Sequence, residues 1–160
     1  MVSDFITLRK LHKILQIAMG WTDSHLHHFK VLDRHSSKKQ IQIGGGYCNE
    51  DKTLLRDIVQ VPGDRFLYKY DYGNNWQHEL LLEVKLIRNK MVRPCCISGE
   101  RNCPPEGCGG HVGYAALLEA LLAPVPVENH DKLTLHINGD FDPGRFNLNE
   151  INKKLRQLKL

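Results

Sequence analysis

Four of the chain's five cysteines fall within residues 94–114, which read PCCISGERNCPPEGCGGHVGY. Zinc in structural sites is held by four side chains at tetrahedral angles, and cysteine thiolates are favoured ligands. Cys96, Cys103 and Cys108 are seven and five residues apart, a spacing with which a folded-back loop can surround one ion. The candidate fourth ligand is His111 or, from the stretch YDYGNNWQH, His78. The segment lacks the CxxC knuckle of zinc ribbons. Buried unliganded thiols that brace the loop, and reactive thiols, therefore stay open as alternatives.

A second candidate site lies in the segment YDYGNNWQH, which contains Tyr70, Asp71, Trp76 and His78. Because side chains alternate along a strand, Trp76 and His78 are expected on one face, with Asp71 within reach across a tight turn. An aspartate–histidine pair is typical of general bases and of metal sites. The aspartate is equally suited to accept the amides of the turn, which would make it structural. Glu106 of the cysteine-bearing loop completes this candidate pocket.

Three further histidines, His25, His27 and His28, lie in the segment HLHHFKVL. His25 and His27 are expected on the same face of a strand, at a spacing that suits a metal ion or a polyanion. Exposed strand histidines without any ligand are also common, so the spacing alone does not decide between the two interpretations.

The elements that must position these residues are predicted by hydrophobic periodicity. Apolar residues recur at three- and four-residue steps from Phe5 to Ala18, which predicts a helix that ends at Gly20. Strong alternation predicts a hairpin over residues 65–87, with Phe66, Tyr68, Tyr70 and Tyr72 on one face and a Gly-Asn-Asn turn. The other predicted elements are strands at 25–32 and 41–43, a short helix after Asp51 or Thr53, a helix at 114–122, and a last helix capped by Asn147 or Asn149.

This order predicts an α+β fold, an antiparallel sheet with helices packed on it, in a single compact domain that spans residues 1–160. Residues 128–140 remain ambiguous between strand and helix. The net charge of +4 permits contact with nucleic acid without requiring it. No membrane-spanning stretch and no secretory signal is visible, and the odd number of cysteines favours reduced thiols, so we expect a cytoplasmic protein.

Five sequence blocks occur in order along the chain: GW-x3-HLHxF, YxYDYGxxWxH, C-x2-G-x3-CPPExCGG-x2-GY, FDPxxF and IN. With these blocks the chain resembles the plasmid pRiA ORF-three-like family, which includes passenger proteins of some bacterial insertion elements. The resemblance extends over residues 8–155. It implies a compact α+β domain of largely unknown biochemical function, found in bacteria and archaea.

The chain departs from the family pattern at three places. It begins without the extra strand and arginine-rich turn that usually precede the first helix, so an edge strand of the family domain is expected to be missing. Asn74 stands where the family usually has an acidic residue, and Gly107 replaces another acidic residue in the CPPE block. Both replacements weaken any acid–base or hard-metal mechanism that the resemblance implies.

Two functions from different classes follow. In the first, the protein is a non-enzymatic interaction or nucleic-acid-associated module of mobile-element type, in which the cysteine-bearing loop and the tyrosine-rich hairpin form a recognition surface, with structural zinc as a candidate cofactor. In the second, it is a small metal-assisted hydrolase or transferase that uses Asp71, His78 and Glu106. The sequence does not name a substrate, a partner or an oligomeric state.

Overall fold

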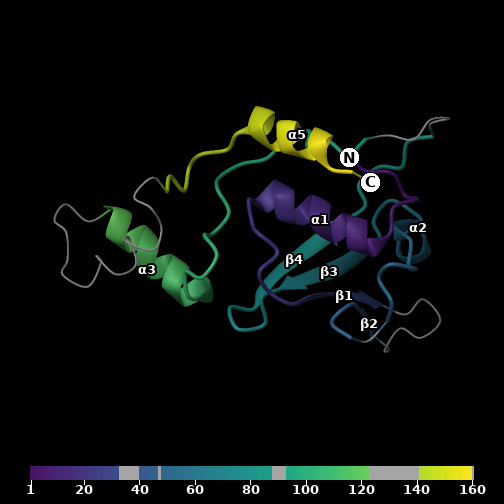
Figure 1. Ribbon diagram of the computed structural model, residues 1–160, viewed down its shortest axis with the longest axis horizontal. Helices are drawn as coiled ribbons and strands as arrows, with labels where there is room; N and C mark the ends of the chain where they lie inside the picture. Colours follow the sequence, from purple (N-terminus) through teal and green to yellow (C-terminus); the bar gives the residue numbers. More distant parts are fainter. Residues whose placement is uncertain (33–39, 47, 88–92, 123–140, 160) are drawn as a thin grey trace.

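The computed structural model describes residues 1–32, 40–46, 48–87, 93–122 and 141–159. Its sheet has the strand order β2-β1-β3-β4, and every neighbouring pair is antiparallel. Figure 1 shows α1 lying across one face of the sheet, α5 beside α1, and α3 standing apart from the sheet. This is the expected α+β architecture. The elements are α1 (Leu8–Met19), β1 (His27–Leu32), β2 (Gln40–Ile43), α2 (Leu55–Ile58), β3 (Arg65–Tyr70), β4 (Trp76–Leu81), α3 (Gly110–Leu122) and α5 (Leu148–Gln157).

Helix α1 is delimited by a residue suited to each end. The Thr7 side chain accepts a hydrogen bond from the backbone N–H of Lys10, and Gly20 ends the helix in the left-handed conformation at φ 74°. A side chain is strained at that φ, so glycine is the natural terminator. The helix begins later than predicted, and Phe5 precedes it with 61% of its surface exposed. The apolar face of α1 packs against the sheet in the main hydrophobic core, which includes Leu8, Leu11, Ile14, Phe29, Phe66, Tyr68 and Tyr70.

The predicted hairpin is confirmed with the register Tyr68↔His78 and Tyr70↔Trp76, but its second strand ends at Leu81 and not at the predicted Ile87. Tyr68 and Tyr70 are completely buried beneath α1, so the prediction that the tyrosines of this hairpin offer an exposed recognition surface is wrong for both. Asp71 has φ 55°, which interrupts the alternation of the strand. Tyr72 therefore leaves the buried face, against the prediction, and its hydroxyl lies 2.7 Å from Nδ1 of His28.

Other element boundaries differ from the predictions by a few residues. The N-cap of α2 is Leu54, not Asp51 or Thr53, and the carboxylate of Asp57 accepts the backbone N–H of Leu54 at 2.9 Å. Helix α3 begins at Gly110, four residues earlier than predicted. Asn147 caps α5 as expected by accepting the N–H of Glu150. Residues 128–140 lie outside the described residues, as does nearly all of the polar turn predicted after residue 32.

No helix among the described residues is long and apolar enough to cross a membrane.

Candidate functional site

Trp21, the residue after the α1 cap, joins three parts of the chain at one end of the sheet. Its indole stacks on the ring of Tyr70, with centroids 4.8 Å apart and planes inclined by 19°. The ring of His78 lies edge-on to it at 5.3 Å. The indole N–H donates a hydrogen bond of 2.9 Å to the backbone carbonyl of Pro104 in the cysteine-bearing loop. The loop and the aromatic hairpin are therefore in contact, and Trp21 is packed between them.

Glu106 holds the same loop in place through polar contacts. Its carboxylate accepts hydrogen bonds from the hydroxyl of Tyr70 and from both the backbone N–H and the hydroxyl of Thr22. Burial opposes ionisation of the carboxyl group, but these hydrogen bonds outweigh it, and the pKa of Glu106 lies below its ordinary value. Both carboxylate oxygens are thus engaged, and the group is ionised near neutral pH.

Asp71 has a structural role in the turn of the hairpin. Its Oδ1 accepts the backbone N–H groups of Gly73 at 3.1 Å and Asn74 at 3.2 Å, and its Oδ2 accepts the side-chain amide of Asn74. Burial raises its pKa, but the hydrogen bonds from Asn74, the nearby His25 and the hydrogen bond from Gly73 together lower it by more, so the pKa lies below the ordinary value. The histidine closest to its carboxylate is His25, at 3.5 Å, not the predicted His78.

His78 projects into the core beside Tyr68, and its Nδ1 is buried with no hydrogen-bond partner among the described residues. Burial lowers the pKa of His78, so the ring is neutral. The five residues of the predicted pocket therefore lie around one end of the sheet, but they do not form an aspartate–histidine pair.

The cysteines and His111 do not assemble into a metal site. No three of Cys96, Cys103, Cys108 and His111 place ligand atoms within 4.8 Å of one another. The thiol of Cys108 is buried and points to the carbonyl of Gly110, whereas the Cys96 thiol donates to the carbonyl of Ser98. Burial raises the pKa of both Cys103 and Cys108 and favours the protonated thiol. This arrangement supports the alternative in which the thiols brace the loop.

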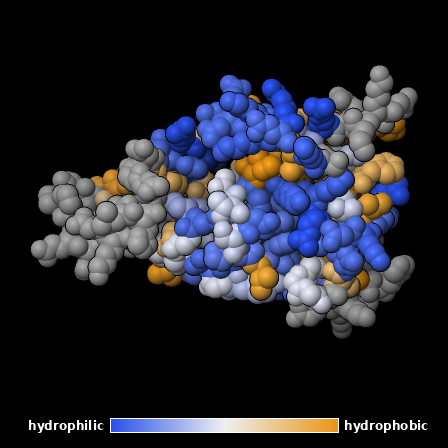
Figure 2. All heavy atoms as spheres, viewed as in Figure 1, coloured by the Kyte–Doolittle hydropathy of each residue, from blue (hydrophilic) through white to orange (hydrophobic). Residues whose placement is uncertain are grey.

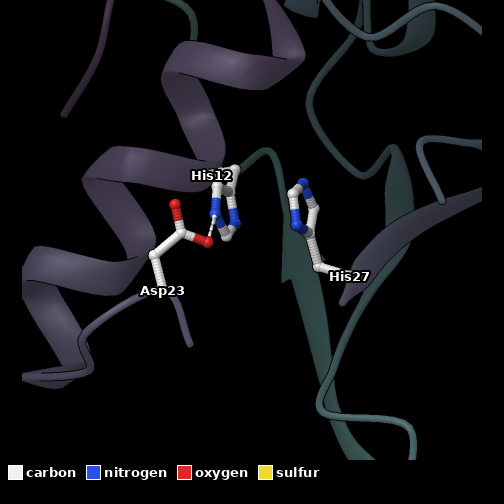
Figure 3. Close-up of side chains that lie close together, drawn as sticks. All are labelled: His12, Asp23 and His27. Carbon is white, nitrogen blue, oxygen red and sulfur yellow. Dashed lines mark hydrogen bonds and ion pairs between the residues drawn. The ribbon is translucent and has the colours of Figure 1, made fainter. Parts of the chain in front are cut away.

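The structure reveals a polar cluster under α1, of which the sequence pattern indicated only His27. His12 of α1, Asp23 and His27 of β1 place ligand atoms within 4.8 Å of one another, and Figure 3 shows the two imidazoles face to face. Their centroids are 3.5 Å apart and their planes differ by 2°. His12 has no solvent exposure, and His27 is buried with 7% of its surface exposed.

Hydrogen bonds fix the protons of this cluster. The Oε1 of Gln16 accepts the backbone N–H of Asp23. The Nε2 of Gln16 therefore faces the Tyr68 hydroxyl and donates to it at 2.9 Å. The Tyr68 proton then points to Nδ1 of His12, 2.8 Å away, and the Nε2–H of His12 donates to Asp23 at 2.7 Å. Burial, and next the proximity of His27, lower the pKa of His12. His12 is therefore a neutral, fully bonded core histidine.

His27 is held by a separate polar network. Its Nε2 lies 2.8 Å from Oε2 of Glu50, and the other carboxylate oxygen of Glu50 pairs with Arg9 at 2.7 Å. Glu50 is 5% exposed. A charge buried to this degree requires such partners, because an unpaired carboxylate would lose its hydration without compensation.

The orientation of the two rings disfavours a metal ion between them. The lone pair of an imidazole nitrogen lies in the ring plane, so a bound metal lies in that plane, about 2.0–2.1 Å from the nitrogen. The rings of His12 and His27 are parallel and stacked, and parallel planes share no point. One ion could contact both rings only if a ring rotated and gave up a hydrogen bond to Asp23, Tyr68 or Glu50. The cluster is suited to holding protons in fixed positions.

One sequence signal could have revealed part of this cluster. His12 and Gln16 follow Leu8 at steps of four, which places two polar residues on the buried face of an amphipathic helix. A polar pair at such positions predicts internal hydrogen-bond partners. No comparable signal identifies Asp23, whose position depends on a backbone φ of 60°.

Comparisons with known proteins agree with this architecture. The chain is 32% identical over 154 residues to the uncharacterized protein y4hQ of Sinorhizobium fredii, a match that covers 96% of this chain and 79% of that protein. A crystal structure of a protein of unknown function, MM3350 from Methanosarcina mazei Go1, matches with a TM-score of 0.80 and 33% identity, over 92% of this chain and 84% of that one. The family model described as plasmid pRiA4b ORF-3-like protein matches residues 1–150, and the chain therefore belongs to that family.

Proposed function

We propose that the protein is a non-enzymatic binding module that contacts a polyanion, with nucleic acid as the ligand class, through the layer formed by α1 and α5. The supporting observation is the distribution of charge. The two helices carry six basic side chains and one acidic side chain, a formal charge of +5, whereas the whole chain has +4. The rest of the chain is thus almost neutral. Because α1 and α5 contact each other, basic side chains of both helices lie in one layer, although Arg9 is paired with Glu50 and Asp51 and adds little net charge there.

Several of these basic side chains are free to reach a ligand. Lys13, Lys153 and Arg156 are exposed, and no ion pair of theirs occurs among the described residues. Lys154 is exposed but pairs with Glu150 at 3.1 Å, an i to i+4 pair that contributes little in water. Figure 2 shows hydrophilic residues gathered over α5. Lysine and arginine on adjoining helices can follow a phosphate backbone without reading its sequence.

The geometry supports this function better than a metal-assisted hydrolase. Asp71 is occupied by the amides of its own turn, and Glu106 is occupied by Thr22 and Tyr70. Neither carboxylate is free to activate water or to open a metal position. A zinc ion in the loop from Cys96 to Cys108 is not part of the proposal, because its candidate ligands do not converge. All five cysteines are free thiols, which suits action in the reducing cytoplasm.

The test is the salt dependence of binding to a fluorescent DNA duplex, measured by anisotropy between about 50 and 200 mM salt. We expect log K to fall linearly with log salt. The reversal Lys153→Glu should weaken binding and reduce the slope by about 1, because one phosphate is no longer neutralised. Lys52→Glu is the matched control, since Lys52 is also an exposed lysine but lies in the loop before α2. Absence of binding at low salt, or equal effects of the two reversals, would contradict the proposal.

A further inference from the structure

Strand β4 is an edge of the sheet, and the chain continues beyond it as residues 82–87, LEVKLI, of which Leu82 is half-buried and residues 83–87 are exposed. Val84, Leu86 and Ile87 expose 64%, 58% and 98% of their surfaces. No backbone hydrogen bond joins residues 83–87 to another segment that the structure describes. An apolar, unpaired continuation of an edge strand is a ready template for another strand.

The backbone of Leu82 fixes which residues face the free edge. Its N–H donates to the carbonyl of Asp64 at 2.9 Å, and its carbonyl accepts the N–H of Gly63 at 2.8 Å. The polar groups of Leu82 thus point toward the β3 side. Because the direction of backbone groups alternates along an extended chain, those of Glu83 and Lys85 point to the open side.

We propose that this edge pairs with the same edge of a second copy of the chain, antiparallel about a two-fold axis at Val84. In this register Glu83 of each copy lies opposite Lys85 of the other, so two ion pairs form. Both residues present their backbone groups outward, so these opposed residues also form the hydrogen-bonded pairs of the ladder. The interface is isologous, because each copy contributes the same segment.

The apolar side chains match in the same register. Leu82 of one copy lies opposite Leu86 of the other, Val84 lies opposite its own equivalent at the axis, and Leu81 lies opposite Ile87. Cross-strand apolar pairs and pairs of opposite charge are the interactions that stabilise antiparallel strands. The exposed apolar surface of Val84, Leu86 and Ile87 would then be partly covered by the opposing side chains.

The segment is complementary to a second copy of itself in this register and not in the neighbouring ones, which favours a second copy of the chain as the partner. An axis at Glu83 opposes two glutamates, and an axis at Lys85 opposes two lysines. A shift by one residue places Lys85 opposite Leu82 and moves every side chain to the other face. When the run Leu-Glu-Val-Lys-Leu pairs antiparallel with a second copy of itself, leucines oppose leucines and glutamates oppose lysines only if the two valines face each other. The proposed pairing of two chains is independent of the proposed binding to a polyanion.

The experiment is sedimentation velocity on the full chain over a range of concentrations, with the charges exchanged. We expect the wild type to form a dimer, and Glu83→Lys and Lys85→Glu each to form monomers, because each opposes like charges twice. The double variant Glu83→Lys/Lys85→Glu restores opposite charges and should dimerise again. An equimolar mixture of the two single variants should form a heterodimer, since their charges are complementary.

Two controls separate this interface from local effects. Lys85 also lies 3.5 Å from Asp4 in the same chain, and Asp4→Asn, which removes that ion pair, should leave the dimer intact. Val84→Asp, which brings two carboxylates together at the axis, should also give a monomer, so the test does not depend on the two charged positions alone. A wild-type protein that remains monomeric at about 100 μM, a concentration far above the dissociation constants of ordinary interfaces, overturns the proposal. A dimer that the single charge reversals do not change also overturns it.

Discussion

The imidazole rings of His12 and His27 lie in parallel planes with their centroids 3.5 Å apart, between the first helix and the sheet. Two positive charges at that separation in a buried environment would repel strongly, so the two rings are not both protonated in the folded state. Asp23 and Glu50 each hold one ring through its Nε2. Burial, and next the proximity of His27, lower the pKa of His12, and burial also lowers the pKa of His28, so protonation of His12 and His28 opposes folding.

Acid should therefore destabilise the protein below about pH 6.5, the ordinary pKa of histidine. His28 gives the clearest case, because burial, followed by the charges of Lys30 and Lys69, lowers its pKa to about 4. The folded state binds fewer protons than the unfolded state between these pH values, so the free energy of unfolding falls as pH falls from about 6.5 to about 4. At about 1.4 kcal/mol per pKa unit, His28 alone accounts for a loss of about 3 kcal/mol.

Denaturant unfolding at a series of pH values tests this expectation. His28→Asn keeps a polar atom near the Tyr72 hydroxyl but does not titrate, and it should reduce the pH dependence in that window. His111→Asn, at an exposed position on α3, should leave the dependence unchanged. An equal dependence in the wild type and in His28→Asn would contradict the prediction.

Tyr68→Phe should lower the free energy of unfolding by about 1–3 kcal/mol, because the Gln16 amide and Nδ1 of His12 both lose a buried partner. Tyr114→Phe is the control, since no hydrogen bond of the Tyr114 hydroxyl occurs among the described residues, and it should change stability by less than about 0.5 kcal/mol. Chemical denaturation of the three proteins measures the difference. Equal stability of Tyr68→Phe and the wild type would show that the buried hydrogen bonds are not formed.

Glu106→Gln should loosen the cysteine-bearing loop without unfolding the sheet, because an amide can accept from Thr22 or Tyr70 at one oxygen only. We expect faster amide hydrogen exchange in residues 103–109, with exchange in β3 unchanged. Glu119→Gln on the exposed side of α3 is the matched control and should affect neither segment. Equal rates of hydrogen exchange in residues 103–109 of the wild type and of Glu106→Gln would mean that the carboxylate does not hold the loop.

The thiols should react in an order set by their burial. Cys48 is exposed and should react first with a thiol reagent, whereas Cys108 is buried and should react only after denaturation. Elemental analysis of the purified protein should find no stoichiometric zinc, since the candidate ligands Cys96, Cys103, Cys108 and His111 do not converge. One zinc per chain together with three masked thiols would contradict this expectation.

The sequence by itself determined which helices and strands form and, to within a few residues, where most of them lie along the chain. Apolar steps of three and four residues defined α1, and Gly20 ended it, because both signals act over a single turn of helix. Alternation and a Gly-Asn-Asn turn defined the hairpin for the same reason. Asn147 was one of two predicted caps for the last helix, and its side chain accepts the N–H three residues on.

Only the tertiary structure decided which polar groups meet. Asp71 was expected beside His78, but a left-handed backbone turned its carboxylate to the amides of Gly73 and Asn74. The pairing of His12 with Asp23 and its stacking on His27 depend on how α1 settles on the sheet, which no local pattern encodes. Hydrophobic periodicity reports which face of an element is buried, whereas the partner of a buried polar atom depends on contacts between distant segments.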